Sequence, residues 1–84
     1  MILHIEHVAV PAPFHLTLRF EEGEERTVDV GPLLNGPVFE PLRNPDYFAL
    51  VSIDPICKTV TWPNGADFAP EALRSLPAVT MPDA

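Results

Sequence analysis

The sequence predicts an α+β domain in which a small, largely antiparallel sheet of four or five strands carries short helical turns and one C-terminal helix. Short runs rich in β-branched and aromatic residues alternate with polar residues, which is typical of half-buried strands. Eleven prolines fall at the ends of these runs, and proline cannot donate to a central strand ladder. The 84 residues suffice for one domain, which we assign to residues 1–76, with residues 77–84 as a frayed tail.

Three strands are predicted in the first part of the chain. The first is β-branched but alternates imperfectly, whereas the second alternates strictly between apolar and polar residues. The third is short and places two valines on one face. The three predicted strands are Ile2–Val10, Phe14–Phe20 and Arg26–Val30.

The register of the hairpin between the second and third strands follows from burial. Opposite residues in an antiparallel pair share a face, so burying Leu18 requires that Val28 lie opposite it. This register also pairs Phe20 with Arg26. It needs an odd number of residues or a bulge in the connection, with Gly23 at positive φ.

The rest of the chain predicts short helical turns, a second hairpin and a final helix. Proline, asparagine and glycine divide Gly31–Tyr47 into turns. In the second hairpin Ile53 lies opposite Val60, and a four-residue loop, Pro55–Lys58, joins the strands. The predicted strands are Phe48–Ile53 and Thr59–Trp62, and the predicted helix is Pro70–Leu76.

Charge and cysteine content restrict the classes of partner. Twelve acids against five bases give a net charge of −7, and the bases are scattered singly. Phosphate binding needs clustered bases, so we expect no direct nucleic-acid partner. The single Cys57 excludes a disulfide within the chain and, with no apolar run of membrane length, points to the cytoplasm. A core this small without cross-links favours support from a protein partner or from self-association.

Signatures of catalysis are mostly missing from the sequence, and we expect no cofactor and no small-molecule ligand. The alternative to an interaction module is a small metal-dependent or hydrolase-like enzyme that uses its His and Asp residues. For a metal, the best set is His4, Glu6 and His15, which requires the first two strands to be neighbours. Exposed polar strand residues are the simpler explanation of this set.

A candidate binding surface combines two segments of the chain. Aromatic residues in the Phe39–Tyr47 connection and in the Asn64–Glu71 loop exceed what a small sheet can bury, and an apolar patch left exposed usually marks an interface. A tight strand-to-helix turn, with an aspartate capping it, is the structural explanation for the loop. Four acids at the tip of the first hairpin can steer a basic partner. The predicted binding residues are Phe39, Tyr47, Trp62, Asn64, Asp67 and Phe68.

Three motifs carry a family resemblance: V-D-V-G-P-L-L at Val28–Leu34, V-F-x-P-L-R-N-P-x-Y-F at Val38–Phe48 and W-P-N-G-A-D-F-A-P-E at Trp62–Glu71. Together they resemble a family of short bacterial domains of unknown function that is marked by a W-P-N-G-A-D-x-x-P-E tail. The resemblance covers residues 5–74. It implies no catalytic residues. Some relatives carry a helix-turn-helix domain after this unit, and many are encoded beside another small protein, which implies a regulatory or toxin–antitoxin-like pairing.

Overall fold

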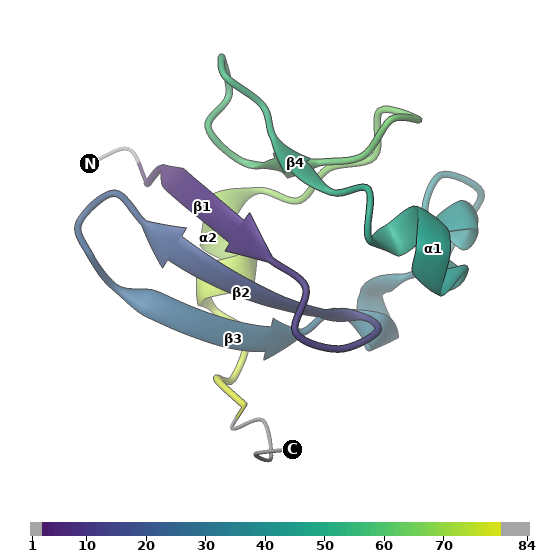
Figure 1. The fold of residues 1–84 in the computed structure, drawn as a ribbon, viewed down its shortest axis with the longest axis horizontal. Coiled ribbons are helices and arrows are strands. Elements are labelled where there is room, and N and C mark those ends of the chain that lie inside the picture. The colour runs from purple at the N-terminus through teal and green to yellow at the C-terminus, as the bar shows by residue number, and fades with distance from the viewer. Residues whose placement is uncertain (1–2, 80–84) are drawn as a thin grey trace.

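The computed structural model describes residues 3–79 and places five strands in two separate antiparallel sheets (Figure 1). The prediction of a single sheet is therefore wrong, although the α+β class and the antiparallel pairing are confirmed. The first sheet contacts the second hairpin, where the amide of Ile5 donates to the carbonyl of Lys58 at 2.8 Å. The first sheet contains β1 (Ile5–Ala9), β2 (His15–Phe20) and β3 (Glu25–Asp29), and the second contains β4 (Ser52–Ile53) and β5 (Val60–Thr61).

Four short helices connect and cover the strands: η1 (Gly31–Leu33), η2 (Glu40–Arg43), α1 (Pro45–Phe48) and α2 (Pro70–Arg74). The sequence predicts only a turn where α1 lies. The side chain of Asn44 accepts a hydrogen bond from the amide of Asp46, and Pro45 occupies the first helical position. This start takes Phe48 into the helix, which leaves β4 only two residues long. Within residues 3–79, no helix reaches the length and apolar character that a membrane crossing requires.

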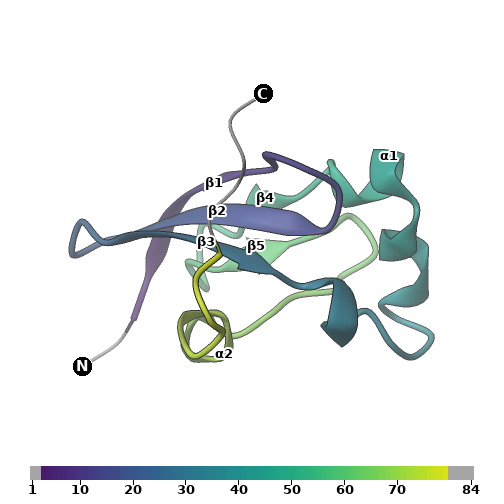
Figure 2. The same cartoon turned by 90° about the horizontal axis from the view of Figure 1, so that it is seen from below.

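One face of the three-stranded sheet packs against the core. Figure 2 shows α2 on one side of β1, β2 and β3, and Val60 of β5 is buried in the same core. The strictly alternating residues of β2 point to that side, and Leu73 of α2 is buried with them. The core contains Ile5, Leu16, Leu18, Phe20, Val28, Val30, Leu34, Leu42, Phe48, Val60, Trp62, Ala66, Phe68 and Leu73.

A bulge explains the imperfect alternation of the first strand. Ile5 pairs with Phe20, but the next pair joins His7 to Arg19, so Glu6 has no partner opposite it. The extra residue lets both Ile5 and Val8 face the core although an odd number of positions separates them. One residue inserted into an otherwise regular strand therefore explains the imperfect alternation in the sequence.

The first hairpin has the predicted face pattern but a different register. The prediction that Leu18 lies opposite Val28 is wrong, because Leu18 pairs with Arg26 and Leu16 pairs with Val28. The shift by two positions keeps every side chain on its predicted face. It shortens the connection to three residues, an odd number, with Gly23 at a φ of +101°. Burial alone determines which residues face inward. Several registers bury the same residues, and the tight turn selects one of them.

The second hairpin has the predicted register and loop. Ile53 pairs with Val60, and the amide of Asp54 donates to the carbonyl of Thr59. The side chain of Asp54 accepts hydrogen bonds from the amides of Cys57 and Ile56, and these bonds hold the pKa of its carboxyl below the ordinary value. The aspartate therefore organises the loop through the backbone, as its position in a type I turn predicts.

Candidate functional site

The structure brings the two predicted binding segments together. The rings of Phe39 and Phe68 stack with their centroids 4.9 Å apart and their planes 9° from parallel. The side-chain amide of Asn64 donates to the carbonyl of Val38 at 2.9 Å. We call this contact region, made of Val38, Phe39, Glu40, Asn64, Asp67 and Phe68, the Phe39–Phe68 junction.

Local backbone chemistry explains the shape of the loop that enters the junction. The amide of Trp62 donates to the carbonyl of Ala66, and Gly65 adopts a φ of +88° that an L residue rarely takes. The side-chain oxygen of Asn64 accepts from the amide of Ala66, while its nitrogen reaches Val38. One asparagine thus closes its own turn and ties the loop to the other segment.

Two of the predicted binding residues lie in the core instead of on the surface. Trp62 is 2% exposed, and its indole N–H donates to the carbonyl of Phe48 at 2.9 Å. Its ring packs against Phe48 and Phe68, with centroids 5.6 and 5.8 Å away. Phe68 is 8% exposed. The expectation that a small sheet cannot bury Phe68 is corrected here, because the ring packs against Phe39 of the connection and against the buried Trp62.

The exposed residues of the junction include both an apolar side chain and acids. Val38 is 52% exposed, and Phe39 is half-buried. Each ring of the stacked pair has an exposed acid as its chain neighbour, Glu40 beside Phe39 and Asp67 beside Phe68. Within the described part of the chain, no hydrogen bond or ion pair of the Glu40 side chain is recorded. The junction therefore combines an exposed aliphatic side chain with two exposed acids that neighbour the stacked rings in the chain.

The remaining predicted residues take other roles. Tyr47 lies on α1, half-buried against the core, and α1 packs on η2. Asp67 was expected to cap the turn before the final helix. Instead its backbone bridges to Thr61, and Ala69 is the N-cap of α2, without a side-chain hydrogen bond.

The two histidines of the predicted metal site, His4 and His15, lie near opposite ends of β2. His4 lies 3.2 Å from the carboxylate of Glu21, at the end of β2. His15 begins β2, where its Nδ1 hydrogen-bonds the carbonyl of Pro13 and its Nε2 lies 4.0 Å from Asp29. Five strand positions separate the two ends, which is about 16 Å. Residues 3–79 contain no group of three His, Cys, Asp or Glu side chains placed to hold a metal ion.

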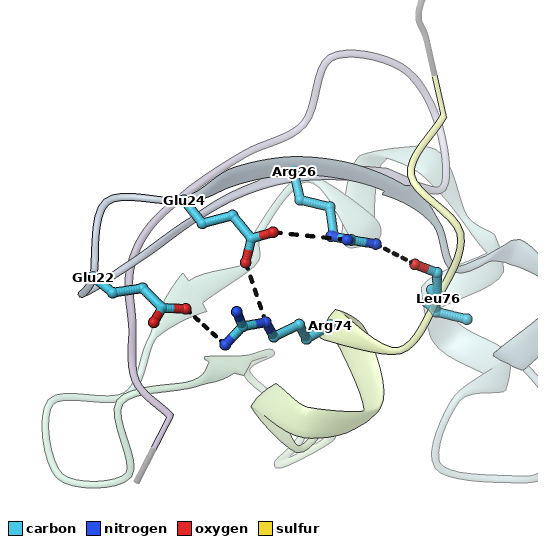
Figure 3. Close-up of polar contacts among 5 residues, drawn as sticks. All are labelled: Glu22, Glu24, Arg26, Arg74 and Leu76. Carbon is cyan, nitrogen blue, oxygen red and sulfur yellow. Dashed lines mark hydrogen bonds and ion pairs between the residues drawn. The ribbon is translucent and has the colours of Figure 1, made fainter. Parts of the chain in front are cut away.

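A polar network ties the tip of the first hairpin to the C-terminal helix, as Figure 3 shows. The guanidinium of Arg74 lies 2.6 Å from Glu22 and 3.1 Å from Glu24. Glu24 also lies 3.7 Å from Arg26, whose guanidinium donates to the carbonyl of Leu76 at 2.6 Å. Two of the four acids at this tip therefore face bases, and Arg74 lies 50 or more positions away from both of them in the chain.

We expect Glu24→Gln to lower the free energy of unfolding by about 0.2 to 1 kcal/mol, because the ion pairs of Glu24 are partly exposed and screened by water. The loss should largely vanish at about 1 M salt. Urea denaturation at low and high salt measures it. Glu25→Gln, on the opposite face of β3, is the matched control. An equal loss for both variants would contradict a specific role of the network.

Comparison with known proteins places the chain in a family without assigning an activity. No curated protein and no solved structure matches it. A family described as "Protein of unknown function (DUF2442)" matches residues 5–76, which include both sheets, the Phe39–Phe68 junction and α2. The chain therefore belongs to the DUF2442 family of proteins of unknown function.

Proposed function

We propose that this chain is a non-enzymatic interaction module whose Phe39–Phe68 junction binds a basic segment of a protein partner. The observation that carries the proposal is the exposed Val38 side chain next to Phe39, in a junction whose stacked rings, Phe39 and Phe68, each have an exposed acid as a chain neighbour. Apolar contact supplies affinity at such a surface, and flanking charge selects a partner of opposite sign.

The charge of the whole chain supports a basic partner. The net charge is −7, and three of the five bases are already engaged within the fold. Arg26 and Arg74 contact glutamates of the first hairpin. Arg43, the base nearest the junction in sequence, donates to the carbonyl of Leu34 and to the side chain of Asn35. Within residues 3–79, glutamates therefore offset the charges of Arg26 and Arg74 but not that of Arg43, and the net charge of −7 is what favours a basic partner.

The biological setting that we propose is regulatory pairing in a bacterial cytoplasm, of the toxin–antitoxin-like kind that the family resemblance implies. A second copy of this chain is a less suitable occupant, because two copies of the junction would bring acids against acids. In this role the chain binds a distinct basic protein and catalyses no reaction itself.

Site-specific photo-crosslinking in the native host tests this proposal. A photoreactive residue at position 38 should yield an adduct with one basic protein, identified by mass spectrometry. The same residue at position 56, where Ile56 is 88% exposed on the loop of the second hairpin, is the control and should not yield that adduct. The partner adduct appearing at position 56 and not at position 38 would refute the proposed site.

Charge reversal tests the acids at the junction. Glu40→Lys and Asp67→Lys, examined singly, should each lower the yield of the adduct on the order of fivefold, mainly through slower association. Glu6→Lys changes the net charge equally at an exposed residue of β1 and should leave the yield unchanged. If all three variants lose the adduct equally, net charge and not the junction drives the pairing.

A further inference from the structure

The outer edge of β3 pairs with no other strand within residues 3–79. The strand order of the first sheet is β1-β2-β3, so β3 has a strand on one side only within residues 3–79 (Figure 1). The other edge, on β1, already contacts the second sheet, where the amide of Ile5 donates to Lys58. An open edge presents unpaired amides and carbonyls to any extended chain.

The register shows which backbone groups face outward. Phe20 donates to the carbonyl of Glu24, and Val30 donates to the carbonyl of Phe14, so these two pairs are of the hydrogen-bonded type. Pair types alternate along an antiparallel ladder, which makes the pairs of Glu25, Thr27 and Asp29 the non-hydrogen-bonded type. The amides and carbonyls of these three residues therefore point away from β2.

The chain itself already uses this edge at one point. The amide of Val79 donates to the carbonyl of Thr27 at 2.9 Å. Arg26 holds the start of this segment through its bond to the carbonyl of Leu76 (Figure 3). Val79 is the last residue that the structure describes, and residues 3–79 supply no further backbone hydrogen bond to the neighbouring outward groups of Glu25 and Asp29.

The side chains at the two ends of the edge select the occupant. Glu25 and Asp29 are both exposed acids. If two copies of β3 paired antiparallel about Thr27, Glu25 of one copy would lie opposite Asp29 of the other, and like charges directly opposite are destabilising. A strand that carries lysine or arginine at these positions makes the same backbone bonds with favourable side-chain pairs.

We propose that the outer edge of β3 binds an extended, basic segment of a partner protein by strand addition, in competition with the chain's own Val79. This edge is a second surface, built from elements other than those of the Phe39–Phe68 junction. Backbone hydrogen bonds to Glu25, Thr27 and Asp29 provide the pairing, and the two acids provide the selectivity.

Amide hydrogen exchange measured by NMR on the full chain tests the proposal with a synthetic probe. The probe is a peptide of alternating lysine and threonine, long enough to span the five residues of β3. It should slow exchange at Glu25, Thr27 and Asp29, whereas the amides of Arg26 and Val28, already bonded to β2, should be unchanged. A matched peptide with glutamate in place of lysine should protect none of them.

Two variants of Val79 test the competition. Val79→Pro removes the amide that caps Thr27, and Val79→Ala keeps it. The lysine peptide should bind about fivefold more tightly to Val79→Pro than to the parent chain, since one backbone hydrogen bond no longer competes. Val79→Ala should bind like the parent.

The outcomes separate the possible occupants. Peptide binding without protection at the three outward amides would overturn the proposal, and so would absence of binding to Val79→Pro. Protection of the same amides that rises with protein concentration in the absence of peptide would also overturn it, because it would identify a second copy as the occupant.

Discussion

Trp62→Ala is expected to lower the free energy of unfolding by about 3 to 5 kcal/mol, the usual cost of truncating a buried aromatic side chain. The ring fills the space between Phe48 and Phe68 and is almost completely buried. The truncation also leaves the carbonyl of Phe48 without its indole donor. Small domains are stable by only about 5 to 15 kcal/mol, so this variant should be largely unfolded in modest urea. Urea denaturation followed by circular dichroism measures the change.

Two further substitutions separate packing from hydrogen bonding. Trp62→Phe keeps most of the apolar contact but removes the N–H, so we expect a loss of about 1 to 3 kcal/mol. His15→Ala, at a half-buried strand position, should change stability by only about 0.5 kcal/mol. A Trp62→Ala variant as stable as His15→Ala would show that Trp62 does not belong to the core.

Leu73→Ala is expected to cost about 2 to 5 kcal/mol and to detach α2 from the sheet. Leu73 is fully buried and is the one buried residue of a helix only five residues long. A helix that short has no stability of its own in water, so its formation depends on this contact. Hydrogen exchange at the amide of Ser75, which donates to the carbonyl of Glu71, reports on the helix directly.

The neighbouring Arg74 distinguishes docking by packing from docking by charge. Arg74→Met keeps an apolar stem on the ring of Phe20 and removes the ion pairs with Glu22 and Glu24. Its cost should be about 1 kcal/mol or less, because the pairs are partly exposed. A larger loss for Arg74→Met than for Leu73→Ala would mean that the polar network, and not the core, holds α2.

Sequence reasoning predicts those parts of the fold that local patterns determine. The loop and register of the β4–β5 hairpin are correct, because Asp54 and Pro55 specify the turn and Ile53 and Val60 require one face. The face pattern of the β2–β3 hairpin is correct, but its register is not. Burial is satisfied by any shift of two positions, and only the geometry of the turn at Gly23 decides between them.

Other features depend on contacts between distant residues that no local pattern encodes. Asn44-Pro45 is a signal both for a turn and for a helix start, and the choice follows from burial of Phe48 in the core. The ion pairs of Arg74 with the first hairpin require knowing that α2 packs under it. For the candidate site, the sequence identifies the two segments that meet, but not that Trp62 and Phe68 lie beneath its surface.

The unpaired Glu6 in β1 determines where this domain tolerates a change in chain length. Removing that residue joins the Ile5–Phe20 and His7–Arg19 pairs into a regular ladder, and no side chain changes face. Removing a residue from within β2 instead turns the rest of that strand over and moves core residues into solvent. Among homologous sequences, single-residue insertions and deletions in the first sheet should therefore accumulate at Glu6 and be rare in β2.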